Sequence, residues 1–162
     1  MSDSEIRKLI DEAEIRNLVG KLAIMADLYE DLEEYYTYWT QDATFDMREP
    51  VGWKEGDKSQ AWIVKGLDEL KANRKQLREV GFQGPGSNVW HANTTLFIDV
   101  KDEANAEAQS YWVLLGSSDS VQLLRVGHYH DTFRKTDGKW KLAYRRVTPG
   151  LAGAVPPKPD EG

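Results

Sequence analysis

Residues 121–147 read VQLLRVGHYHDTFRKTDGKWKLAYRRV, and this stretch decides the fold. Asp137 and Gly138 form a dipeptide that is typical of a tight β-hairpin turn. After the turn, basic and apolar residues alternate, as they do in a strand with one polar face. The sequence therefore predicts a hairpin whose long strand spans residues 121–135 and whose closing strand spans residues 140–147.

Two further strands are predicted before this hairpin. Residues 106–115 are rich in Tyr, Trp and Val, which favour strands, and residues 89–100 alternate between apolar and polar side chains. Polar turn residues separate the segments at 102–103 and at 116–120. Four consecutive strands joined by short turns predict an antiparallel meander.

The N-terminal segment has a helical pattern instead. Ser2 and Glu5 are spaced for a capping box at the start of a helix. Apolar residues then recur at three- and four-residue steps, as on one face of a helix: Ile15, Leu18, Val19, Leu22, Met25 and Ala26. A second apolar stripe predicts a following helix, after a break near residues 27–31: Leu32, Tyr35, Tyr36 and Trp39.

The middle of the chain predicts a short strand, a loop and a short helix. The strand covers residues 43–47, and the helix covers residues 67–80. Between them, residues 48–60 are charged and contain one Pro and two Gly, which predicts a loop long enough to serve as a lid. Helices followed by antiparallel strands give an α+β class, with one domain over residues 1–148 and a proline-rich tail over residues 149–162.

Composition narrows the class of protein. The 162 residues are 40% hydrophobic, which allows one domain with a real core. The absence of cysteine excludes disulfides and thiolate chemistry. A net charge of -6 argues against a nucleic-acid partner, which needs a basic face. The acidic start does not resemble a signal peptide, and no apolar run has membrane-spanning length, so we expect a cytoplasmic protein that does not bind membranes.

Four local patterns, in order, carry a resemblance to a known family. They are Glu14-Ile15-Arg16-Asn17-Leu18; then Asp31-Leu32-Glu33-Glu34-Tyr35 followed by Gln41-Asp42-Ala43-Thr44-Phe45; then His91-Ala92-Asn93; and finally Gly127-His128-Tyr129-His130-Asp131 leading to Asp137-Gly138-Lys139-Trp140-Lys141. Over residues 12–147 the chain resembles the SnoaL-like branch of the nuclear transport factor 2-like superfamily.

The resemblance implies a fold and a range of functions. The fold is a cone-shaped, curved antiparallel sheet wrapped by N-terminal helices and enclosing a pocket. Relatives include polyketide cyclases, scytalone dehydratase-like enzymes, ketosteroid isomerase-like enzymes and a hexachlorocyclohexane dehydrochlorinase. Most use no metal and no organic cofactor, and many are dimers or trimers. The superfamily also contains binding modules without activity, so the fold does not define the function.

His91 is the first candidate for a catalytic residue. Histidine exchanges protons near neutral pH, which suits a general base. The resemblance also matches His91 to a strand histidine that serves as the base in the dehydratases and the dehydrochlorinase. The alternative is a structural histidine that holds a loop.

A base histidine needs a carboxylate to orient its ring. The resemblance puts that acid near the end of the first helix, where Asp27 and Asp31 both lie. Counting back from Phe45 places the family's acid at Leu28, so Asp27 fits only with a one-residue insertion. Otherwise the pair is absent, or Asp31 supplies it.

His128 and His130 lie two residues apart on a predicted strand and therefore share one face, while Tyr129 faces the other way. The resemblance favours Tyr129 in the pocket as a hydrogen-bond donor. An outward histidine pair at a subunit interface and a zinc site built with His91 are the alternatives.

The remaining candidates would bind substrate. Asn93 shares the face of His91, and Arg125 or Arg145 could stabilise an oxyanion. The full substrate-binding set is Asn93, Tyr29, Trp39, Trp62, Tyr111, Trp112, His128, His130 and Arg145.

These residues predict a cofactor-independent lyase or isomerase that acts on a small cyclic or aromatic substrate. Dehydration, cyclisation and double-bond migration share this proton chemistry, so the sequence does not separate them. The alternatives are a non-catalytic small-molecule binding module and the small subunit of a ring-hydroxylating dioxygenase. We expect a homo-oligomer, either a dimer or a trimer.

Overall fold

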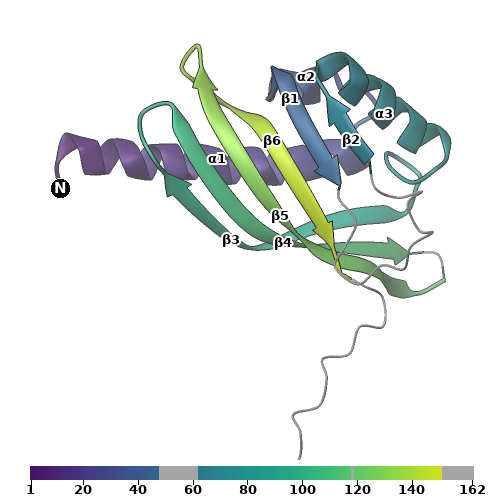
Figure 1. Ribbon diagram of the computed structural model, residues 1–162. Coiled ribbons are helices and arrows are strands. Elements are labelled where there is room, and N and C mark those ends of the chain that lie inside the picture. The colour runs from purple at the N-terminus through teal and green to yellow at the C-terminus, as the bar shows by residue number, and fades with distance from the viewer. Residues whose placement is uncertain (48–61, 118, 151–162) are drawn as a thin grey trace, which may run out of the picture.

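The computed structural model describes residues 1–47, 62–117 and 119–150 (Figure 1). The order of elements is α1 (Asp3–Leu28), α2 (Glu33–Thr37), β1 (Trp39–Met47), β2 (Trp62–Lys65), α3 (Leu67–Glu79), β3 (Val89–Val100), β4 (Asn105–Ser117), β5 (Val121–Thr136) and β6 (Lys139–Pro149). The predicted α+β order is confirmed, with helices first and the long strands afterwards.

The six strands form one curved, open sheet in the order β2-β1-β6-β5-β4-β3. The four C-terminal strands pair antiparallel in chain order, as the predicted meander requires. The hairpin turns at Asp137 and Gly138, both of which have positive φ. β1 departs from the antiparallel pattern because it lies parallel to β6.

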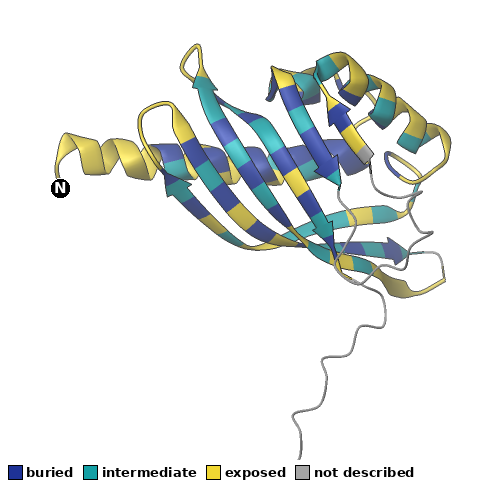
Figure 2. Cartoon of the chain, viewed as in Figure 1, coloured by how far each residue is buried: buried dark blue, intermediate teal, exposed yellow. Residues whose placement is uncertain are grey.

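α1 crosses one face of the sheet (Figure 1). Ser2 and Glu5 form the predicted capping box, so the helix begins where the sequence indicates. The first turns project beyond the sheet and are exposed, whereas the later turns are buried (Figure 2). The buried stripe contains all six of the predicted apolar residues: Ile15, Leu18, Val19, Leu22, Met25 and Ala26.

A buried polar contact fixes α1 to the β5–β6 hairpin. The Asp11 carboxylate accepts hydrogen bonds from Lys135 Nζ at 2.5 Å and from Trp140 Nε1 at 3.0 Å. Burial alone would raise the pKa of Asp11, but these two donors outweigh it and hold the pKa below its usual value. Charged contacts as well as apolar packing therefore hold α1 in its position on the sheet.

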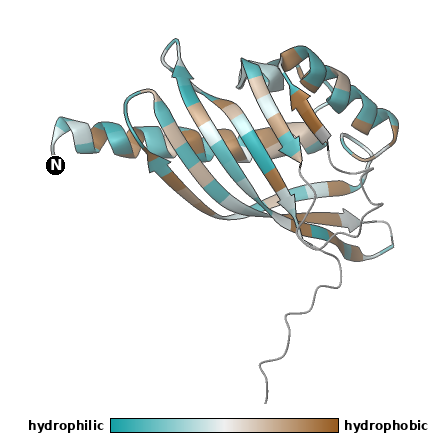
Figure 3. Ribbon diagram, in the orientation of Figure 1, coloured by the Kyte–Doolittle hydropathy of each residue, from teal (hydrophilic) through white to brown (hydrophobic). Residues whose placement is uncertain are grey.

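Alternation along the strands separates the two faces of the sheet. In β5, Tyr129, Asp131 and Phe133 are buried toward the helices, while the residues between them are more exposed. Figure 3 shows the corresponding alternation of hydrophobic and hydrophilic residues. This settles the orientation of the long strand: the Tyr129 side faces inward.

The boundary between the second helix and the first strand differs from the sequence prediction. Trp39 belongs to β1 and not to the second helix, because α2 ends at Thr37 and the Trp39 ring packs in the core beside Tyr35 and Phe45. The predicted loop at residues 48–60 and most of the predicted tail, residues 151–162, lie outside the described residues.

Candidate active site

Asp27 and His91 are brought together across a gap of 64 residues. Asp27 Oδ1 lies 2.8 Å from His91 Nδ1, and Asp27 Oδ2 accepts the His91 backbone N–H at 2.6 Å. The Asp27 side chain is 4% exposed and the His91 side chain 16% exposed. A carboxylate on Nδ1 fixes the ring and favours the tautomer that carries its proton there. His91 Nε2 is then the nitrogen able to accept a proton.

Arg78 anchors the helix end that carries Asp27. Its guanidinium donates to the backbone carbonyls of Ala26, Tyr29 and Glu30 at 2.7–3.3 Å. These carbonyls lie at the C-terminus of α1, where the helix itself leaves them without partners. A positive charge is also favourable at this end of the helix dipole. Arg78 on α3 thus holds the last turn of α1 in place.

His91 contributes to an inner cavity of about 90 Å³ between the sheet and the helices. Residues from β1, α3, β3, β4, β5 and β6, together with Phe82 between α3 and β3, line it: Phe45, Met47, Arg74, Leu77, Phe82, His91, Trp112, Leu114, Arg125, Tyr129, Arg145 and Val147. A larger hollow of about 440 Å³, the outer groove, lies elsewhere and is lined by residues that include Phe97, Tyr111 and His128. The outer groove lacks the His91–Asp27 pair, so the inner cavity is the better candidate site.

Tyr129 lies between an aromatic ring and a guanidinium. Its ring stacks on Trp112 with centroids 5.8 Å apart, and the Arg145 guanidinium lies 4.1 Å from the ring centroid. Burial raises the pKa of Tyr129 to about 12. The phenol therefore stays protonated at neutral pH and can donate a hydrogen bond.

Arg145 is neutralised by Asp131. The two side chains form a buried, bidentate ion pair with contacts of 2.8 Å and 2.6 Å. Burial alone would lower the pKa of Arg145, but the Asp131 charge outweighs it and keeps the guanidinium protonated. Arg145 thus carries a fixed, compensated charge beside Tyr129.

Gly127 is required by its close contacts with Thr148 and Trp112. A Cβ at residue 127 would lie 2.4 Å from the backbone O of Thr148 and 2.7 Å from Cζ2 of Trp112, which is directly opposite in the β4–β5 register. Such a contact is too short for any side chain, so only glycine allows Trp112 to occupy its place in the cavity wall.

The structure separates the sequence-predicted residues into two groups. His91, Tyr129, Trp112 and Arg145 line the inner cavity, with Asp27 behind His91. Asp31 is not the partner of His91: it is exposed and accepts the backbone N–H of Glu33, at the start of α2.

The predicted histidine pair lies on the outer face of the sheet, opposite to the face that carries Tyr129. His128 and His130 have the parity opposite to Tyr129; His128 is exposed on the outer groove, and His130 is half-buried. Neither is among the residues that line the inner cavity, so the set of three histidines considered for zinc is not assembled with His91. Tyr111 belongs to the same outer groove and is 59% exposed.

Of the four remaining predicted residues, three do not line the inner cavity, and the side chain of the fourth lies outside the described residues. Tyr29 is an exposed residue that ends α1, and Trp39 packs in the core. Asn93 is half-buried and is not among the residues that line the inner cavity. Trp62 belongs to β2, and its side chain lies outside the described part.

Sequence reasoning missed Arg74, which is 4% exposed and lines the inner cavity. A signal existed: Arg74 follows Leu70 by four residues and precedes Leu77 by three, so it falls on the apolar stripe of α3. A charged side chain is rarely buried on the apolar face of a helix, so this position indicates a specific role.

The curved sheet, its covering helix and the inner cavity define an α+β domain of the nuclear transport factor 2-like, cystatin-like class. A family model for the SnoaL-like domain matches residues 7–146, and the chain belongs to that family. No match was found among proteins with curated descriptions.

Several solved structures share the fold. A protein of unknown function from Mycobacterium tuberculosis is 22% identical, with a TM-score of 0.74 and coverage of 94% of this chain and 79% of that chain. A candidate scytalone dehydratase from Novosphingobium aromaticivorans is 20% identical, with a TM-score of 0.64 and coverage of 91% and 89%. The β subunit of a candidate aromatic-ring-hydroxylating dioxygenase from the same organism is 15% identical, with a TM-score of 0.68 and coverage of 90% and 92%.

None of the described helices combines the length and the apolar character needed to cross a bilayer.

Proposed function

We propose that this domain is a cofactor-independent acid–base lyase or isomerase for a small cyclic or aromatic compound. The observation that carries the proposal is the 2.8 Å contact between Asp27 and His91, with His91 in the wall of the inner cavity. The similarity to a candidate scytalone dehydratase is consistent with it.

The chemistry starts at His91 Nε2, which takes a proton from a carbon next to a carbonyl or a leaving group. Asp27 stabilises the imidazolium that forms, since its carboxylate already accepts the Nδ1 proton. Charge then develops on the substrate oxygen, where the protonated Tyr129 donates a hydrogen bond. The proton on His91 returns to another carbon or to the leaving group, so no external oxidant or reductant is needed.

The experiment that tests this function is solvent deuterium exchange. Panels of cyclic ketones, hydroxyketones and carboxylates are incubated with the protein in D₂O, and incorporation at carbon is followed by NMR and mass spectrometry. We expect catalysed exchange or elimination with at least one compound, and a loss of about 100-fold or more in His91→Gln.

His128→Gln is the matched control, because it removes a histidine from the outer face of the same sheet. Equal rates in the wild type and in His91→Gln would refute the proposal.

The second candidate function is a partner subunit without chemistry of its own. The structural similarity to a dioxygenase β subunit favours it. In that case no compound would exchange, and the protein would co-purify with an oxygenase subunit when the two are expressed together. A binding module without a partner is the remaining alternative.

We also propose that the domain forms a homo-oligomer. Exposed aromatic residues on the outer groove, Phe97 and Tyr111, provide apolar surface for such contacts. Light scattering after size-exclusion chromatography distinguishes a monomer from a dimer or a trimer.

A further inference from the structure

Arg74 is a buried cation for which the described residues provide no counter-charge. Its side chain is 4% exposed, its Nε is buried with no hydrogen-bond partner, and no hydrogen bond or ion pair joins it to any residue in the described part of the chain. A guanidinium remains charged in proteins, and a buried charge is costly unless it is paired. The folded domain therefore maintains an unfavourable arrangement at this position.

Two other buried or part-buried arginines near the site are compensated. Arg145 pairs with the Asp131 carboxylate, and Arg78 donates to backbone carbonyls of α1. Arg74 differs from both although it lies on the same helix as Arg78. Arg78 Nε is also buried without a partner, but the terminal nitrogens of Arg78 make three hydrogen bonds, whereas no hydrogen bond is found for the Arg74 guanidinium among the described residues.

Aromatic rings support Arg74 without using its donors. Its guanidinium carbon lies 4.7 Å from the Phe45 ring centroid and 6.0 Å from that of Tyr35. A cation–π contact stabilises the charge through the ring face and leaves the N–H groups free. The side chain is held in position while its fork of donors remains available.

A second unsatisfied donor belongs to the same cavity. Trp112 Nε1 is buried and has no acceptor among the described residues. Arg74 and Trp112 come from α3 and β4, and both line the inner cavity with His91. Trp39 Nε1 and Arg78 Nε are buried without partners too, but neither residue lines the inner cavity. Arg74 and Trp112 differ because their donors belong to one cavity, where an acceptor on a ligand would pair with them.

We propose that Arg74 binds the anionic oxygen of the ligand, and that the ligand is therefore a small organic carboxylate. Carboxylates match the planar donor fork of arginine, which binds them in a bidentate manner. The inner cavity of about 90 Å³ is smaller than the ~150 Å³ that accommodates benzene, so it takes the carboxylate and only part of a ring attached to it. This inference rests on the proposed function only for the claim that the bound carboxylate is the substrate.

The test is a comparison of a charged ligand with its neutral analogue. Binding of benzoate, cyclohexanecarboxylate, benzamide and cyclohexanecarboxamide is measured by titration calorimetry. In the wild type we expect at least one carboxylate to bind about tenfold or more tightly than its amide. Arg74→Gln should abolish this preference, and Arg74→Lys should restore part of it.

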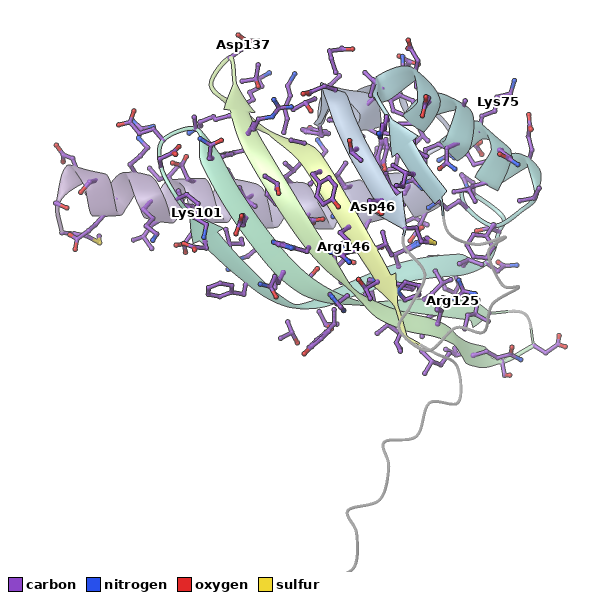
Figure 4. The ribbon with its side chains drawn as sticks, in the orientation of Figure 1. Asp46, Lys75, Lys101, Arg125, Asp137 and Arg146 are labelled. Carbon is purple, nitrogen blue, oxygen red and sulfur yellow. The ribbon has the colours of Figure 1, made fainter. Side chains whose placement is uncertain are left out.

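Lys75→Gln is the matched control. Lys75 is the next residue of α3, pairs at 3.9 Å with Glu79 and projects outward from the helix (Figure 4). The Lys75→Gln substitution also removes one positive charge from α3, but Lys75 does not line the inner cavity. The carboxylate binding of this variant should therefore equal that of the wild type. Circular dichroism and thermal melting of each variant verify that it is folded.

Three outcomes would overturn the inference: no carboxylate binds better than its amide, Arg74→Gln retains the preference, or Lys75→Gln loses it to the same extent.

Deuterium exchange separates this inference from the proposed function. Carboxylate binding that depends on Arg74, without exchange that depends on His91, would leave a binding module and refute only the lyase or isomerase. Exchange that depends on His91 and is restricted to neutral compounds, with no effect of Arg74→Gln, would refute only the role of Arg74.

Discussion

The Asp27 carboxylate holds His91 at two points: Oδ1 lies 2.8 Å from the ring Nδ1 and Oδ2 accepts the backbone N–H at 2.6 Å. A single side chain thus fixes both the ring and the strand from which it projects. This double contact ties the end of α1 to the beginning of β3, next to the inner cavity.

Asp27→Asn tests this contact. The amide nitrogen cannot accept the Nδ1 proton, and the amide oxygen can serve only one of the two donors. We expect exchange to fall by about 100-fold or more, with a smaller change in ligand affinity, as measured by deuterium incorporation and calorimetry. Asp31→Asn is the control, since Asp31 is exposed and accepts the backbone N–H of Glu33 at the start of α2. An Asp27→Asn protein with wild-type exchange would contradict the role of Asp27.

Arg78→Ala should disturb the same site from a distance. It leaves three carbonyls at the end of α1 without their donor, so Asp27 loses its fixed position. We expect the free energy of unfolding to fall by about 1–2 kcal/mol, measured by chemical denaturation. Exchange should fall as well, and Arg78→Lys should recover part of both. Lys75→Ala, at an exposed position of the same helix, is the control. If Arg78→Ala is as stable as Lys75→Ala, Arg78 does not anchor the end of α1.

Tyr129 should titrate outside the usual range. Burial raises its pKa to about 12, above the value of about 10 for an unfolded chain. The folded state therefore retains its proton where the unfolded state has lost it. This contribution to stability is complete below pH ~10 and is lost as the pH rises toward ~12. Ultraviolet difference titration should show a late-titrating phenol that is absent in Tyr129→Phe.

Asp11 should matter for acid stability. Its pKa is held below the usual value by Lys135 and Trp140, so the folded state favours the ionised form. The stabilisation is present above the unfolded pKa, near 3.9, and is lost as the pH falls through the lower folded value. Asp11→Asn should cost about 2 kcal/mol at neutral pH and flatten the acid dependence of unfolding. Asp3→Asn, at the exposed start of α1, is the control.

Arg74→Met should not destabilise the empty protein. It removes an uncompensated buried charge and retains an apolar side chain of similar length. We expect the melting temperature to stay equal to that of the wild type or to rise, while carboxylate binding is lost. A drop as large as that of Arg78→Ala would mean that the contacts with Phe45 and Tyr35 make Arg74 a structural residue.

Local patterns predicted the elements because their causes are local. The Asp137–Gly138 turn, the alternation in residues 89–100 and the heptad-like stripe of α1 depend on neighbours a few residues apart. The ordered family patterns added the curved sheet and the position of His91 at the start of a strand. Strand β1 was harder to delimit, since Trp39 fits a helical stripe as well as a strand and only core packing decides between them.

What the tertiary structure alone decided is which distant residues meet. The sequence left Asp27 and Asp31 open as partners of His91, because the exact end of α1 depends on Arg78 reaching over from another helix. It also left the facing of β5 open, because the burial of Tyr129 beside Trp112 and Arg145, with His128 on the exposed face, appears only in the folded sheet. The cavity role of Arg74 follows from the same cause: a helix face becomes a cavity wall only when a sheet is placed opposite it.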